Sequence, residues 1–228
     1  MKNPGILILL ALIFCFQNTT AQQHKFEVGV EGGAGITSMW GNALVTKYND
    51  PMIGFAYGAT FQYNFPKIFS IKTNLFYERK GCVTRGTFLE PSGFTSGIFI
   101  SRSNFDYLTM PVLLRANFGK KLKFFINTGP YFGYLIRQTY SFKGVNFPKT
   151  TSDNTTYFKN LDVGLTMGAG ISIPLTKELV LSWEVRNNLG LYNISKWPVY
   201  NNGTLNTYSN NFLLGIAYKL GARAEASK

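Results

Sequence analysis

The clearest pattern in this chain is an alternation of large apolar residues with small or polar residues. Between Phe55 and Phe65 every second position is Phe or Tyr, with Ala59 as the one small exception, and the positions between them are Ala, Gly, Thr, Gln and Asn. This period of two is typical of a β-strand with one apolar and one polar face. Because the period returns along the whole chain, it predicts a closed antiparallel barrel.

Eight segments show this period, an even number as in bacterial outer-membrane barrels. Each has at least the ~9–11 residues that a tilted strand needs to cross a bilayer. The predicted strands are Phe26–Ile36, Ile53–Phe65, Ile68–Lys80, Phe105–Phe118, Leu122–Tyr140, Leu161–Pro174, Leu179–Leu189 and Asn211–Leu220.

The connections between these segments alternate in length. Three are tight, at Phe65–Lys67, Gly119–Lys121 and Pro174–Lys177. Four are long and rich in Gly, Ser, Thr and Asn, at Thr37–Met52, Gly81–Asn104, Ser141–Asn160 and Gly190–Asn210. We therefore predict an all-β fold, an eight-stranded antiparallel up-and-down transmembrane β-barrel with four long extracellular loops and three short periplasmic turns.

Side-chain volume predicts which face meets lipid. The interior of an eight-stranded barrel is just wide enough for side chains or one small ligand, so the many large apolar groups are expected to point outward. The opposite face carries small residues and both signs of charge, which predicts a lumen plugged by hydrogen bonds and ion pairs. The expected lumen polar network is Glu27, Glu31, Lys72, Glu78, Arg115, Arg137, Asp162, Glu184 and Arg186.

The N-terminal segment reads as a cleaved secretory signal over residues 1–21. Lys2 gives the positive start, Ile6–Phe16 is apolar, and small residues end at Ala21. A retained anchor is the alternative, although the apolar run is short for a span. The expected organisation is a barrel over residues 22–220 followed by a short C-terminal tail over 221–228. Cleavage would leave Cys82 as the only cysteine, which excludes an intrachain disulfide.

The chain is basic, with 23 Lys and Arg against 11 Asp and Glu. An exported chain rarely meets nucleic acid, so we expect none as a partner. The expected partners are outer-membrane lipid and lipopolysaccharide, together with an envelope protein partner, and a solvated loop surface is the alternative reading of the charge. A barrel has no open edge, so a monomer is expected.

The sequence offers little for catalysis. Its only histidine is His24, ahead of the first strand, so neither a Ser-His-Asp arrangement nor a multi-histidine metal site is available in the barrel. We expect no catalytic residues, no cofactor and no metal. Carboxylates such as Glu78, Asp162 and Glu184 leave open a barrel hydrolase, but lumen carboxylates are more often salt-bridged.

The long loops combine basic and aromatic residues that could contact glycolipid or a partner protein. Alternatively, their apolar residues extend the hairpins above the membrane. The loop contact candidates are Arg85, Phe94, Phe99, Arg102, Lys143, Phe147 and Lys149.

One strand resembles a known family. The segment Phe105–Arg115, with the sequence FDYLTMPVLLR, is similar to the Leu-x-Tyr-Leu-x-Ile-Pro-Leu-Leu-x-Lys strand of the Bacteroidota outer-membrane β-barrel family that includes PorT-like proteins. Thr109 and Met110 depart from that pattern, where the family often has an acid and Ile. Similar pieces are Tyr77–Gly81, Gly129–Gly133, Asp162–Gly164 with Gly168–Gly170, and Asn211–Tyr218.

The resemblance implies an outer-membrane barrel but assigns no catalytic residues, and it links PorT itself to type IX secretion. Our leading hypothesis is a non-enzymatic structural, interaction or envelope-assembly protein with a plugged lumen. The alternative is a binding or uptake protein for a small hydrophobic or glycolipid ligand, through its loops or lumen. A carboxylate-based hydrolase is the third.

Overall fold

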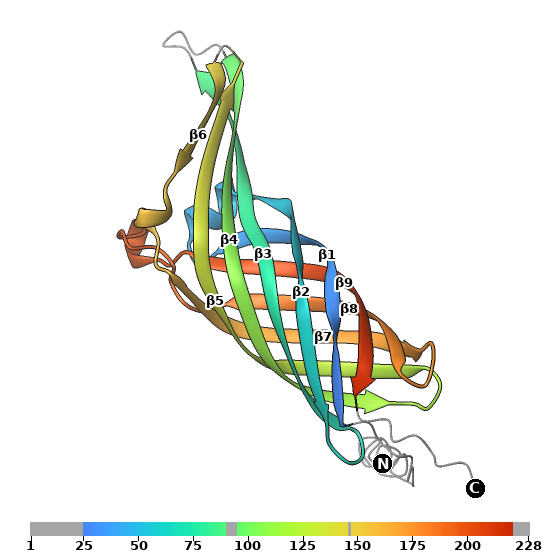
Figure 1. Cartoon of the computed structure of the whole chain (residues 1–228). Helices are drawn as coiled ribbons and strands as arrows, with labels where there is room; N and C mark the ends of the chain where they lie inside the picture. The colour runs from blue at the N-terminus through green and yellow to red at the C-terminus, as the bar shows by residue number, and fades with distance from the viewer. Residues whose placement is uncertain (1–24, 90–94, 146, 221–228) are drawn as a thin grey trace, which may run out of the picture.

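The computed structural model describes residues 25–89, 95–145 and 147–220. They form one antiparallel sheet, which confirms the all-β prediction (Figure 1). A short helix, α2 (Ala43–Tyr48), and two single turns of 3-10 helix, η1 (Thr155–Tyr157) and η2 (Tyr200–Asn202), lie in the connections. The strands are β1 (Phe26–Trp40), β2 (Asp50–Asn64), β3 (Phe69–Leu89), β4 (Thr95–Phe118), β5 (Lys123–Gly144), β6 (Phe147–Asp153), β7 (Leu161–Pro174), β8 (Leu179–Gly190) and β9 (Asn206–Leu220).

Eight of these strands close into a ring. The sheet order is β4-β3-β2-β1-β9-β8-β7-β5-β6, and β4 also pairs with β5, so every strand except β6 has two neighbours in the ring. The first and last strands, β1 and β9, pair with each other over the whole length of β1 and so close the ring. Strands adjacent in sequence therefore pair in order around a barrel, with β6 attached outside it along β5.

The alternation in the sequence becomes two faces of this barrel wall. In the unbroken register of β1 with β2 and β9, Glu31 lies between Gly58 and Gly215 on the inward face. The next row places Gly32 between Tyr57 and Leu214 on the outward face. Large apolar side chains on the outward face are exposed on all eight strands of the ring, as their volume predicts; examples are Val30, Ile53, Leu75, Met110, Phe132, Met167, Val185 and Phe212.

Two of the predicted long loops are mostly strand. Residues 81–104 belong largely to β3 and β4, whose register continues from Gly81–Asn104 to Leu89–Thr95, and residues 141–160 contain the end of β5 and the additional strand β6. The prediction of eight strands with loops at these positions was therefore wrong in this detail, and hairpins that extend beyond the ring were the correct alternative. We call the sheet made by residues 84–89, 95–102, 139–144 and β6 the extension. It rises past the other strands at the top of Figure 1.

The short connections lie at the end of the barrel away from the extension (Figure 1). They join β2 to β3, β4 to β5 and β7 to β8. Two of them turn through residues with a left-handed backbone, Lys67 with φ 78° and Gly119 with φ 96°. In the part of the chain that the structure describes, no helix is both long and apolar enough to cross a membrane.

Candidate functional site

The barrel interior holds a polar network near the short turns, which we call the turn-side network. Glu184 is its centre: one carboxylate oxygen accepts from Arg186 Nε at 2.5 Å, and the other accepts from Arg115 Nη2 at 2.8 Å and Lys72 Nζ at 3.4 Å. Lys72 also pairs with Glu31. The members of this network are buried, and they are Glu31, Lys72, Asn74, Arg115, Asn127, Glu184 and Arg186.

These contacts cross the full width of the barrel. In the ring of eight strands, β3 and β8 lie opposite each other, with three strands between them on either side. Lys72 on β3 nevertheless contacts Glu184 on β8, and Asn74 on β3 accepts a hydrogen bond from Arg186 on β8 at 3.1 Å. Side chains from opposite walls therefore meet, and the lumen is filled at this level.

A second polar network lies closer to the long connections, and we call it the loop-side network. Lys80 Nζ lies 3.1 Å from Asp162 Oδ2 and 3.6 Å from Glu78 Oε2. Asp162 also accepts hydrogen bonds from the Tyr131 hydroxyl and, at 2.7 Å, from the Thr207 hydroxyl. Its members come from five strands and are Glu78, Lys80, Tyr131, Asp162, Asn188, Thr207, Ser209 and Asn211.

The two networks balance their charges. Together they hold four cations (Lys72, Lys80, Arg115, Arg186) and four carboxylates (Glu31, Glu78, Asp162, Glu184), each at most 6% exposed. Each of the eight takes part in at least one ion pair within the lumen. Burying an unpaired charge is costly, and the equal number of opposite charges leaves none of these eight groups without an oppositely charged partner.

An apolar cap closes the interior above the loop-side network. Phe105 on β4 meets the ring of Phe158 edge-on, with their centroids 4.8 Å apart. Ile194 is completely buried, and backbone hydrogen bonds tie it to Lys159 and Leu205. The connections between β6 and β7 and between β8 and β9 thus fold over the barrel mouth. We define the cap by Met39, Val45, Cys82, Phe105, Tyr107, Leu135, Phe158, Ile194 and Leu205.

Seven of the nine residues expected in the lumen network lie in the two networks just described. Glu27 lies at the turn end of the barrel instead, where it is half-buried and accepts a hydrogen bond from Asn64 Nδ2 at 3.0 Å. Arg137 was placed wrongly by the sequence: its side chain is 57% exposed and pairs with Asp153 on β6 at 3.0 Å.

A β-bulge explains the wrong assignment of Arg137. The register of β4 with β5 slips between Asp106, which faces Arg137, and Tyr107, which faces Leu135. Ile136 is the extra residue, so the inward positions of β5 change from odd to even numbers and Gln138 points inward instead. Strict alternation through this point puts Arg137 on the wrong face.

The sequence analysis also missed interior residues. Lys80 is completely buried and stands two residues after Glu78, so the same alternation could have identified it. Several aromatic residues occupy inward positions and pack against the buried cations: the Arg115 guanidinium lies 3.7 Å from the centroid of Phe125, and that of Arg186 lies 5.4 Å from Phe76. The same alternation places Phe76 between Asn74 and Glu78, but the size of an aromatic ring argued for the outward face.

The loop contact candidates lie on the extension, except Phe94, which is outside the described residues. Phe99 and Phe147 pack with Phe88 and Phe142, with centroids 5.2–6.3 Å apart, and we call these four rings the aromatic cluster. The basic candidates are exposed and lie on the opposite face of the extension; they are Arg85, Arg102, Lys143 and Lys149. The described residues contain no group of three or more metal-ligating side chains, and His24 lies outside them.

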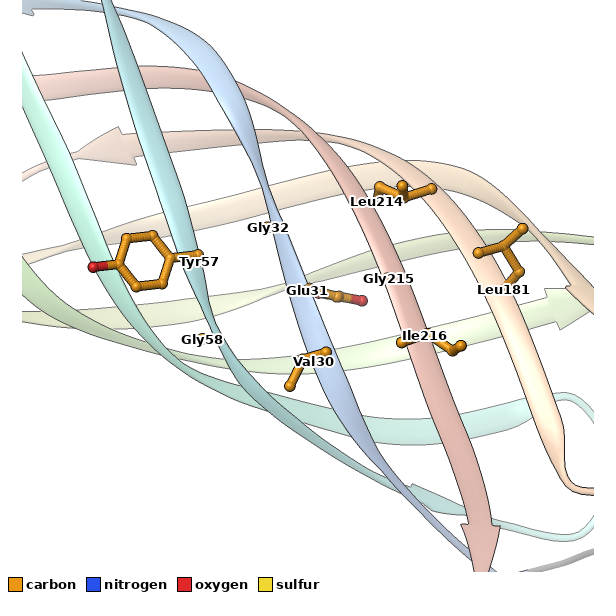
Figure 2. A pocket seen from close by; sticks show the side chains of 9 residues that line it. All are labelled: Val30, Glu31, Gly32, Tyr57, Gly58, Leu181, Leu214, Gly215 and Ile216. Atoms are coloured by element: carbon orange, nitrogen blue, oxygen red, sulfur yellow. The ribbon is translucent and has the colours of Figure 1, made fainter.

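The outer wall of the barrel carries a shallow hollow of about 580 Å³ at Gly32 (Figure 2). Gly32 leaves a gap in the outward row between Tyr57 and Leu214, and Val30 and Ile216 border the gap on the next row. This space therefore opens on the apolar outer wall rather than into the lumen.

The architecture defines the class: an antiparallel barrel with an apolar outside and a charged, hydrogen-bonded inside is typical of outer-membrane proteins. A family model matches residues 17–196, and the chain belongs to that family, described as outer membrane protein beta-barrel domain. This membership supports a location in the bacterial outer membrane.

The chain is also similar to solved outer-membrane structures. Neisserial surface protein A shares 14% identity over 86% of this chain and 97% of its own, with a TM-score of 0.45. Outer membrane protein W of E. coli shares 10% identity over 86% of this chain and 97% of its own, with a TM-score of 0.44. OprG from Pseudomonas aeruginosa shares 13% identity over 88% of this chain and 99% of its own, with a TM-score of 0.38. Comparison with curated proteins gives no match.

Proposed function

We propose that this protein is a closed, non-conducting outer-membrane barrel without enzymatic activity, which acts as a structural or interaction component of the envelope. In this proposal the short turns face the periplasm, and the extension projects to the outside of the cell. The extension then presents its two faces to neighbouring envelope molecules. A role in envelope assembly, as the PorT-like resemblance implies, is the form of this function that we favour.

The observation that carries this proposal is the contact of Lys72 with Glu184 across the barrel diameter. Ion pairs that join opposite walls favour a lumen without a continuous aqueous path, and the apolar cap above them supports the same interpretation. A porin needs a wide lumen, whereas an eight-stranded barrel is filled by its own side chains. The geometry therefore favours a contact function over transport of solutes.

The burial of the lumen carboxylates favours a structural role for them over a catalytic one. Glu78, Asp162 and Glu184 are each at most 3% exposed, and each accepts hydrogen bonds from neighbouring lumen side chains. A general acid or base must reach its substrate within hydrogen-bond distance. These groups are already engaged inside a closed lumen, so the proposal gives them a structural role.

Conductance measurement tests the closed lumen. The refolded full-length chain is inserted into planar lipid bilayers, with a general porin as the positive control, and the heat-modifiable gel shift reports folding. We expect no steady single-channel conductance and no liposome swelling in small sugars. Steady solute flux through the folded protein contradicts the proposal.

The aromatic cluster favours a second candidate, the binding of a small hydrophobic ligand. Its four rings lie together on the face of the extension that continues the barrel interior. Tritium-labelled or fluorescent fatty acid added to the folded protein tests it, with Phe99→Ser and Phe142→Ser as variants. Saturable binding that both variants remove supports this candidate, whereas unchanged partition into the detergent alone removes it.

A further inference from the structure

The outward face of the extension and of the wall beneath it carries more cations than it can pair. Three acidic side chains of the described residues lie there, and each binds one arginine: Asp106 binds Arg79 at 2.6 and 2.8 Å, Asp50 binds Arg85 at 2.5 Å, and Asp153 binds Arg137 at 3.0 Å. Among the described residues of this face, the basic side chains that keep no acidic partner are Arg102, Lys143 and Lys149.

Strand pairing brings these three cations together. Arg102 pairs with Ser141 and Ile100 pairs with Lys143, so Arg102 and Lys143 are diagonal neighbours on one face, with Cα atoms about 7–8 Å apart. Thr150 pairs with Phe142, which places Lys149 beside Lys143. Like charges that face each other across strands destabilise a sheet. The lumen balances four cations with four carboxylates, whereas this cluster has no carboxylate partner among the residues that the structure describes.

The height of the cluster points to the kind of anion. On the outward face of β4, the apolar residues Leu114, Met110 and Leu108 are exposed, and the first charged row begins at Asp106. Arg102 lies six residues beyond Leu108, which is about 20 Å along the tilted strand. Its face continues the lipid-facing wall. With the extension facing outward, the cluster therefore lies above the hydrocarbon region on the lipid-facing side of the wall, rather than over the barrel mouth.

We propose that Arg102, Lys143 and Lys149 bind phosphate groups of the phosphorylated glycolipid of the outer leaflet, lipopolysaccharide. The Arg102 guanidinium suits two phosphate oxygens at once, and the two lysines add point charges on either side. The inference rests on the outward orientation of the extension in the proposed function. It adds a ligand class and a site to that function.

The test measures binding of purified lipopolysaccharide to the folded full-length protein in a zwitterionic detergent. The variant carries Arg102→Gln, Lys143→Gln and Lys149→Gln. The matched control carries Lys120→Gln, Lys121→Gln and Lys177→Gln, which removes the same charge from exposed residues at the opposite end of the barrel. Lipopolysaccharide stripped of its phosphates and inorganic phosphate serve as further probes, and the gel shift shows that all three proteins are folded.

We expect the extension variant to lose about 100-fold in affinity, at roughly fivefold for each basic residue, while the control stays within about twofold. The stripped lipid should bind the unaltered protein as weakly as the variant binds the intact lipid. Equal losses in both variants, or unchanged binding of the stripped lipid, overturn the proposal. Binding of inorganic phosphate with the same affinity as the glycolipid also overturns it. A failure here leaves the closed lumen standing, because conductance reports that property separately.

Discussion

Lys80 and Asp162 form an ion pair across the barrel, with Nζ and Oδ2 3.1 Å apart and both side chains completely removed from solvent. Lys80 comes from β3 and Asp162 from β7, which are not neighbours in the ring. The ring of Tyr131 covers the ammonium group, and its hydroxyl donates to the carboxylate. The pair therefore links separate walls of the barrel. If one partner is removed, water cannot reach the other to solvate its charge.

Removal of one partner should destabilise the protein strongly. Asp162→Asn leaves the Lys80 charge buried with one fewer carboxylate, and we expect a loss of about 3–5 kcal/mol in the free energy of unfolding. Urea unfolding of the protein in lipid vesicles, followed by tryptophan fluorescence, measures it. Arg85→Gln breaks the exposed pair with Asp50 and is the control, with an expected change of at most about 1 kcal/mol. Equal changes for the two variants contradict a buried pair.

Removal of both partners should cost less than removal of the lysine alone. Lys80→Met leaves the buried carboxylates of Asp162 and Glu78 without their cation, whereas the double variant Lys80→Met with Asp162→Leu leaves the carboxylate of Glu78, which keeps hydrogen bonds from neighbouring side chains. We expect the double variant to be more stable than Lys80→Met, in the same unfolding measurement. A double variant as unstable as the sum of the singles shows that the two side chains act independently.

The lumen shows which buried residues the alternation in the sequence can predict and which it cannot. Alternation identifies seven of the buried charged residues because each occupies an inward position on a regular strand. It fails at Arg137, because the extra residue Ile136 reverses the inward positions and no local motif marks the bulge. It also cannot show that Lys72 meets Glu184, since contacts across the barrel depend on how eight strands close.

A substitution in the apolar cap should lower the stability of the protein without making the barrel conduct ions. Ile194 is completely buried among cap residues, so Ile194→Ala leaves a cavity and should cost about 2–5 kcal/mol. The lumen networks lie beneath the cap, and the variant should therefore remain closed to ions in planar bilayers. If the folded variant conducts ions, the cap rather than the polar filling closes the barrel.

The cap and the extension were beyond the reach of the sequence for a different reason. Glycine, serine and asparagine in Gly81–Asn104 indicate a loop, yet strand pairing continues through it as far as Leu89 and Thr95. Tertiary pairing outweighs the weak preference of these residues for turns. Ile194 lies in a connection without a strand pattern, and only the folded chain shows that it is buried.

Two glycines on neighbouring strands should respond differently to a methyl group. Gly215 faces the lumen, where an added Cβ lies 2.5 Å from Glu31 Cγ, while Gly32 faces the outer hollow, where its closest contact is Tyr57 Cβ at 3.0 Å. We expect Gly215→Ala to cost about 1–3 kcal/mol, because the filled lumen cannot move aside. Gly32→Ala should cost less, since a shift of a few tenths of an ångström between its Cβ and that of Tyr57 is enough to relieve the contact. Urea unfolding compares the two, and the reverse order contradicts the assignment of faces.

The junction of β6 with η1 should respond to acid. Hydrogen bonds from the Thr155 hydroxyl at 2.6 Å and its backbone N–H at 3.0 Å, together with Arg137, hold the pKa of Asp153 below its usual range. Because the pKa is lower in the folded chain, the stabilisation is present above the unfolded value of about 3.9 and is lost as the pH falls through the folded value. Amide exchange of residues 153–158, corrected for intrinsic rates, should therefore quicken below about pH 4. Asp153→Asn should remove this pH dependence, and Thr155→Val should raise the pKa of Asp153 more than Arg137→Gln does.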